Sequence, residues 1–77
     1  MDFSRFRALA PRQRALVSMA VMIDGQDAVQ YLEHDAVHGE ILGKVAASLA
    51  SIDLELRIPL LGSLARQAFR EISQEEA

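Results

Sequence analysis

Cysteine is absent from this chain of 77 residues, and lysine occurs once, at Lys44. Without cysteine there is no disulfide, no thiolate–zinc site and no cysteine nucleophile. No apolar run approaches the roughly 18–20 residues that a membrane-spanning helix needs. The four glycines show no spacing typical of a phosphate-binding loop. Stability must therefore come from a hydrophobic core, from association with another chain, or from both.

The composition indicates apolar surface beyond what a core can hold. Hydrophobic residues make up 51% of the chain and the mean hydropathy is +0.11, whereas a domain of this size buries only about 60% of its unfolded surface. A contiguous apolar patch at the surface usually marks a partner site. Charge is divided unevenly, with a net +3 in residues 1–14 and a net −6 in residues 15–77. The body of the protein should repel nucleic acid, while the N-terminal segment could attract it.

The apolar pattern predicts an all-α fold: one domain, residues 1–77, forming a small bundle of three to five helices. Residues 1–10 form either a short helical turn or a loose N-terminal arm. A helix begins at Pro11, which suits a first helical position, and stops at Asp24-Gly25. Asp24 can cap a short second helix, which ends around His34 or Asp35. The first of these helices repeats apolar residues at helical spacing, and the set is Ala15, Leu16, Met19, Ala20 and Ile23.

The clearest pattern belongs to a central helix at about 40–56. Its large apolar residues recur at steps of three and four, which is a heptad seam, and a second strip consists of glycine and alanine. The stretch IDLELRI at 52–58 also alternates as a strand would, but no other stretch alternates in a way that could pair with it, so helix is favoured. Pro59 should end, kink or restart the helix. A last helix follows, with Phe69 among its inward residues, and residues 73–77 should fray.

Two apolar strips on one helix predict self-association. The other helices of so small a domain can cover one strip well. In a two-fold dimer, the other strip would pack against the same strip of a second copy. We therefore predict a homodimer, against the alternative of a compact monomer whose last helix folds over the seam. The residues expected at or near the interface are Leu42, Val45, Leu49, Ile52, Leu56, Leu60 and Leu61.

The stretch EHDAVHGE, residues 33–40, holds the only two histidines. On a continuous helix His34 and His38 would share one face and Asp35 could act as a base, as in zinc hydrolases. Gly39 argues against such a helix, and no further histidine or cysteine exists to complete the site. We interpret the stretch as the junction of two helices and predict neither a metal nor another cofactor. If the protein did bind a metal, His34 and His38 would be the candidate ligands.

The N-terminal segment alternates aromatic and basic residues. In one interpretation its phenylalanines cover an edge of the core and its arginines remain in water. In the other, the segment docks onto a protein, an RNA or an anionic membrane surface. The residues assigned to partner binding are Phe3, Arg5, Phe6, Arg7, Arg12 and Arg14.

No group of residues indicates catalysis, since serines are scattered and no pair of carboxylates is placed in a buried site. The apolar run at 15–23 lacks a cleavage site behind it, so a signal peptide is not indicated and a cytoplasmic location is expected. The sequence thus predicts a non-enzymatic interaction or regulatory module that self-associates. A nucleic-acid-binding accessory protein using the basic N-terminal segment is the alternative, and a metal-binding protein is a more remote one.

Overall fold

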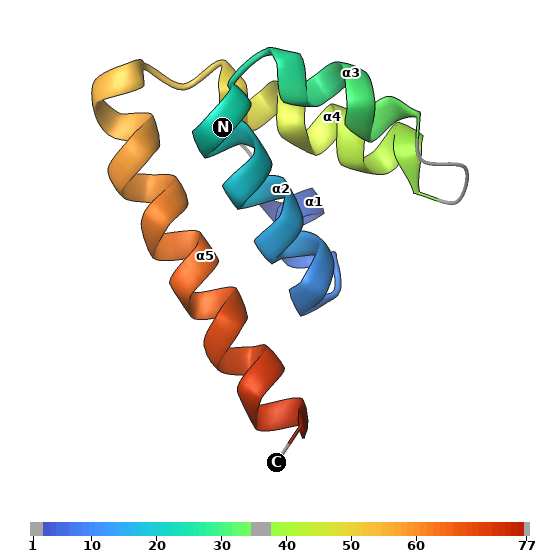
Figure 1. The fold of residues 1–77 in the computed structure, drawn as a ribbon, viewed down its shortest axis with the longest axis vertical. Helices are drawn as coiled ribbons and strands as arrows, with labels where there is room; N and C mark the ends of the chain where they lie inside the picture. Colours follow the sequence, from blue (N-terminus) through green and yellow to red (C-terminus); the bar gives the residue numbers. More distant parts are fainter. Residues whose placement is uncertain (1–2, 35–37, 77) are drawn as a thin grey trace.

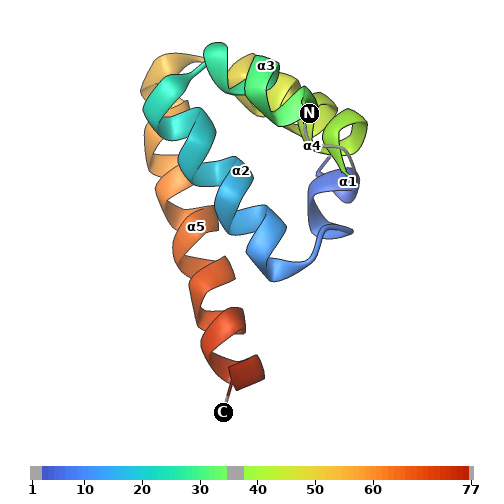
Figure 2. The same cartoon turned by 45° about the vertical axis from the view of Figure 1, so that its right-hand side comes forward.

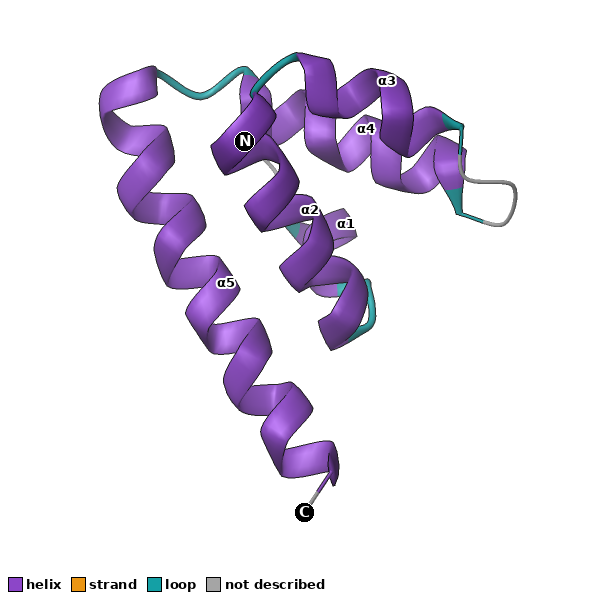
Figure 3. Ribbon diagram, viewed as in Figure 1, coloured by secondary structure: helices purple, strands orange, loops and turns teal. Residues whose placement is uncertain are grey.

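The computed structural model describes residues 3–34 and 38–76, and these form five helices. The helices are α1 (Ser4–Arg7), α2 (Pro11–Asp24), α3 (Asp27–Glu33), α4 (Gly39–Ala50) and α5 (Leu54–Glu76). All regular structure within the described residues is helical, as Figure 3 shows. The predicted all-α fold is therefore confirmed, and the ambiguous stretch 52–58 is helical from Leu54 onwards.

The helices form two antiparallel pairs. α2 runs along α5 in the opposite direction, and α3 and α4 lie side by side across one end of that pair (Figure 1). α1 lies behind α2 in this view and comes out beside it in Figure 2. Only α2 packs substantially against α3, α4 and α5 alike. The central helix is therefore α2, and not the 40–56 segment that the sequence suggested.

The helix predicted at 40–56 is in fact interrupted. α4 ends at Ala50, α5 begins at Leu54, and a turn at 51–53 separates them. Serine hydroxyl groups bond to the backbone at this end of α4: Ser48 Oγ donates to the Lys44 carbonyl at 3.2 Å and Ser51 Oγ donates to the Ser48 carbonyl at 2.7 Å. Such bonds compete with continued helix, which explains why serine is a weak residue in helix interiors.

A side chain of α5 stabilises the C-terminal end of α4. The carbonyl of Ala50, left without a helical partner, accepts a hydrogen bond from Nη1 of Arg57 at 2.8 Å and a longer one from Nε2 of Gln26 at 3.4 Å. Because the heptad spacing crosses this turn, its last two positions do not continue the buried seam. Ile52 is only partly buried and Leu56 is exposed.

α5 continues through Pro59, which neither ends nor restarts it. Pro59 lies in the second turn, where its missing N–H removes one helical hydrogen bond. Leu61 and Ala68 are buried as expected, whereas Phe69 is exposed, contrary to the expectation from spacing. The helix includes residues 73–76, and fraying of this end in solution remains a prediction.

α4 is buried on two sides, as its two strips predicted. The large residues Leu42, Val45 and Leu49 enter the core, and so do Ala46 and Ala50 of the small strip. The glycines bring α3 close. A Cβ added to Gly39 would lie 2.5 Å from the carbonyl oxygen of Glu33, and one added to Gly43 would overlap the Glu33 side chain. The small strip is therefore the surface on which the end of α3 rests.

The face that α2 buries differs from the predicted one. Its buried residues are small: Ala15, Val17, Ser18, Ala20 and Val21. The large residues Leu16, Met19 and Ile23, which the spacing had assigned to the core, are 49%, 37% and 71% exposed. α5, the helix beside α2, also buries small residues, Ala65 and Ala68. Short side chains on both helices permit close approach of their axes, so size decided which face of α2 turned inward.

Ser18 is a weak point in this packing. It is fully buried, and its hydroxyl oxygen has no hydrogen-bond partner within the described part of the chain. A buried polar group without a partner costs about 1–3 kcal/mol, and alanine is also the better helix former. We expect Ser18→Ala to raise the free energy of unfolding by about 1 kcal/mol, measured by urea titration. A lower midpoint for this variant would show that the hydroxyl has a partner in solution.

Candidate functional site

The N-terminal segment is folded onto the body. Phe6 on α1 and Leu9 after it are buried in the core cluster, and Phe3 packs against that cluster. Arg5 and Arg7 are exposed. This arrangement matches the interpretation in which the apolar residues of the segment cover an edge of the core while the arginines between them stay in water.

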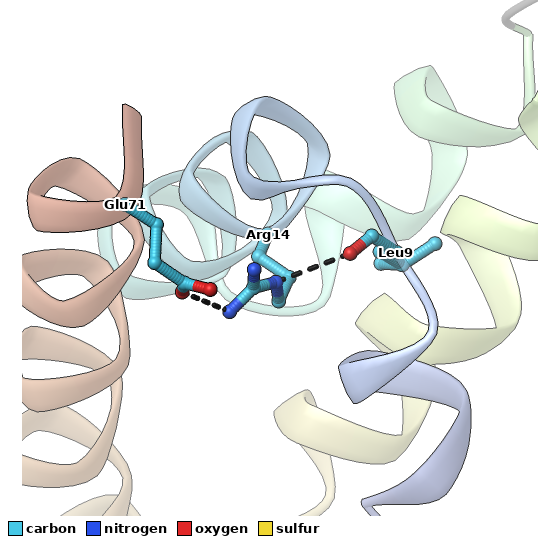
Figure 4. Close-up of polar contacts among 3 residues, drawn as sticks. All are labelled: Leu9, Arg14 and Glu71. Carbon is cyan, nitrogen blue, oxygen red and sulfur yellow. Dashed lines mark hydrogen bonds and ion pairs between the residues drawn. The ribbon is translucent and has the colours of Figure 1, made fainter. Parts of the chain in front are cut away.

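Arg14 connects the start of α2 to the end of the N-terminal segment and to α5. Its Nη1 donates to Oε2 of Glu71 on α5 at 2.5 Å, and its Nε donates to the carbonyl oxygen of Leu9 at 3.1 Å (Figure 4). The hydrogen bond from Arg14 lowers the pKa of Glu71, and the same bond raises the pKa of Arg14. Since the folded chain holds the Glu71 proton less tightly than the unfolded chain, this contribution to stability is present above the unfolded pKa and is lost as the pH falls.

The six residues assigned to partner binding therefore separate into two groups. Phe6 and Arg14 are engaged within the fold, and Phe3 is half-buried. Arg5 and Arg7 on α1 and Arg12 on α2 remain at the surface. The ion pair of Arg14 could not be predicted from spacing, because its partner lies 57 residues further along the chain.

The two histidines lie at helix ends. His34 directly follows α3 and His38 directly precedes α4, in agreement with the interpretation as a junction. Asp35, considered as a base, falls outside the described residues. Within residues 3–34 and 38–76 no three histidine, aspartate or glutamate side chains come together in a way that could hold a metal ion.

Most of the predicted self-association residues belong to the core of a single chain. Leu42, Val45, Leu49 and Leu61 are 2% exposed or less. Leu60 is partly buried and lines a cavity with Phe3 and Phe6 of the N-terminal segment, and Ile52 packs against the core. Of the seven, only Leu56 is well exposed. Apart from Leu56, the seam is thus largely covered by the helices of its own chain, so most of the apolar area open to a second copy lies on a different surface.

That different surface is available on α2. Arg12, Leu16, Met19 and Ile23 are all exposed and follow one another at steps of four, three and four, so they share one side of the helix. We call these four residues the outer face of α2. The spacing of this face is visible in the sequence, where Leu16, Met19 and Ile23 were interpreted, together with Ala15 and Ala20, as the buried side of the helix.

An acidic cluster lies where α2 ends. Asp24 does not cap α3, whose N-cap residue is Gln26; its carboxylate instead accepts a hydrogen bond from the Tyr31 hydroxyl at 2.6 Å. This hydrogen bond, together with burial and the charges of Asp24 and Asp27, raises the pKa of Tyr31 to about 12. The carboxylates of Asp24 and Asp27 make the C-terminal end of α2 negative, while Arg12 makes its other end positive.

Tyr31 is the only tyrosine and no tryptophan is present, so its ionisation can be followed by ultraviolet absorbance. We expect a midpoint near pH 12 in place of 10, and a lower midpoint in Asp24→Asn. Because the folded chain holds this proton more tightly, the associated stability is present below pH 10 and is lost as the pH rises toward 12. Asp53→Asn, at an exposed position between α4 and α5, is the matched control. A wild-type midpoint near 10 would contradict the bond to Asp24.

The comparisons with known proteins add no family. A scan against protein-family models found no match, and searches of curated proteins and of solved structures found none either. None of the helices in the described residues is long and apolar enough to cross a membrane.

Proposed function

We propose that the protein is a non-enzymatic interaction module that self-associates through the outer face of α2. The observation that carries this proposal is the exposure of Leu16, Met19 and Ile23 on one side of a helix whose other sides are packed. Each of these side chains leaves apolar surface in water, and removing that surface is favourable by about 25 cal/mol per Å². A heptad-spaced apolar stripe is also the kind of surface that helices bury against one another.

The charges flanking the stripe favour a second copy as the occupant. In a two-fold arrangement with antiparallel α2 helices, Leu16 of each copy faces Ile23 of the other and the two Met19 side chains meet near the axis. The same arrangement places Arg12 of each copy toward the end of the other α2, where Asp24 and Asp27 lie. Opposite charges therefore approach twice in one interface, which favours this orientation over the parallel one.

The mass of the protein in solution tests this proposal. Light scattering on a gel-filtration peak should give the mass of a dimer when the protein concentration is on the order of tens of micromolar. Met19→Glu should give the mass of a monomer, because the two new carboxylates would lie close together at the two-fold axis and repel each other. Its helical circular dichroism should be unchanged, because the residue is exposed in the single chain. A folded wild-type monomer would contradict the proposal.

Two control variants locate the interface. Leu56→Glu alters the one well-exposed residue of the seam predicted from the sequence, and Ile41→Glu alters an exposed residue of α4. Both should remain dimeric. If Leu56→Glu dissociated the dimer and Met19→Glu did not, the interface would lie at the start of α5 and not on α2. Arg12→Glu should weaken the dimer, and the additional change Asp27→Arg should restore it.

The nucleic-acid alternative has narrower support. Arg14 is only partly exposed and bonds to Glu71, and the exposed basic residues of the N-terminal segment and α2 are Arg5, Arg7 and Arg12. Binding to RNA or DNA through so few phosphate contacts should be weak, and it should fall further as salt rises because each contact releases a counterion. Titrations at two salt concentrations distinguish it from apolar self-association, which salt leaves largely intact.

A further inference from the structure

A groove of about 570 Å³ lies between the N-terminal segment and α4. Arg5 and Leu9 line it from one side, and Glu40, Ile41 and Lys44 of α4 line it from the other. Its volume is within the range of about 300–1,000 Å³ that small-molecule sites occupy. None of the four residues of the outer face of α2 lines the groove, so an inference about it does not depend on self-association.

Two large apolar residues, Leu9 and Ile41, line the groove. Leu9 is almost fully buried and provides the floor, while Ile41 leaves 54% of its surface exposed and forms part of the wall. Ile41 points away from the core cluster, to which Leu42 and Val45 of the same helix belong. An aliphatic group placed in the groove would cover Ile41 and remove its apolar surface from water.

The groove is lined by three charged residues and by the polar residues Gln13 and His38. Arg5 and Lys44 supply two positive charges, and Glu40 supplies one negative charge. Lys44 Nζ already donates to Glu40 Oε1 at 3.1 Å, so the net excess of one positive charge corresponds to Arg5. In a chain with a net charge of −3, a groove whose charged lining residues sum to one positive charge is a local region that attracts anions.

We infer that the groove binds a small monocarboxylate with an aliphatic body. The carboxylate is placed at Arg5, whose guanidinium can donate two parallel hydrogen bonds to it, while Lys44 neutralises Glu40 on the opposite side of the groove. The aliphatic body lies over Leu9 and Ile41. Glu40 favours a single negative charge, because a second one would lie beside its carboxylate without a cation to balance it.

Octanoate is the probe for this site, and octylamine and 1-octanol share its chain without its charge. In ¹⁵N-labelled protein, octanoate should produce saturable shifts of the amides of Leu9 and Ile41 at concentrations on the order of a millimolar or below. Octanol should bind more weakly and octylamine weakest of the three. Equal binding of all three probes, shifts centred on other residues, or no saturation would each overturn the inference.

Three substitutions test the assigned roles. Arg5→Gln and Lys44→Gln remove exposed charges, so the fold should persist and octanoate should bind roughly two- to fivefold more weakly in each. Ile41→Ser should weaken octanoate and octanol alike, because it alters the apolar wall. Arg70→Gln, which removes an exposed arginine of α5 far from this groove in the sequence and absent from its lining, is the control and should leave binding unchanged. Undiminished binding by Arg5→Gln would exclude the groove as the carboxylate site.

Discussion

Leu49→Glu is expected to unfold the protein. Leu49 is 0% exposed and belongs to the core cluster around α4. Truncating a buried leucine alone typically costs about 2–5 kcal/mol, and a glutamate there must in addition lose its hydration or take up a proton. Since small domains are stable by only about 5–15 kcal/mol in total, this single change removes most of the stability. Circular dichroism should show loss of the helical signal at room temperature.

The same variant distinguishes a core role from an interface role for Leu49. If the heptad seam were an interface between two copies, Leu49→Glu would give a folded monomer. Burial of Leu49 within one chain predicts an unfolded chain instead. Ile41→Glu on the same helix is the matched control: Ile41 is exposed, so this variant should keep its helical signal and unfold cooperatively. A cooperative transition at the wild-type temperature in Leu49→Glu would refute the packing of α4.

Gly39→Ala should be the most damaging addition of a single methyl group. The new Cβ would lie 2.5 Å from the carbonyl oxygen of Glu33, 3.0 Å from its carbonyl carbon and 3.2 Å from the carbonyl oxygen of Leu32. All three are backbone atoms, so no change of rotamer relieves the overlap and α3 must move away from α4. Overpacking of this kind costs about 1–3 kcal/mol. The reason is close approach and not backbone conformation, because Gly25 is the one described residue with positive φ.

Gly62→Ala is the control for this prediction, with the opposite sign. Gly62 lies inside α5, and a Cβ built on it has no neighbour within 4 Å. Alanine is favoured over glycine in a helix interior by about 0.5–1 kcal/mol. Urea unfolding should therefore shift to a lower midpoint in Gly39→Ala and to a higher one in Gly62→Ala. A common direction for both variants would mean that helix propensity outweighs the contact between α3 and α4.

Part of the candidate surface could have been predicted from the sequence. The spacing of Leu16, Met19 and Ile23 is visible without a structure, and so is the position of Arg12 one turn before them. What spacing could not show is which side of the helix is covered. The run at 15–23 is apolar nearly all the way round, so its periodicity contains two competing faces. The groove beside α4 could not be predicted at all, because Arg5 and Lys44 are brought together only by the docking of α1.

The sequence by itself determined the local features of this protein. Proline at position 11 and Asp24-Gly25 set the ends of α2, and the spacing of Leu42, Val45 and Leu49 set the buried side of α4, because helix ends and helix faces depend on neighbours within a few residues. The tertiary structure decided what each face packs against. It covered the seam with helices of the same chain and turned the small residues of α2 toward the core, since contacts between helices are selected by side-chain size and distant partners, neither of which a local pattern records.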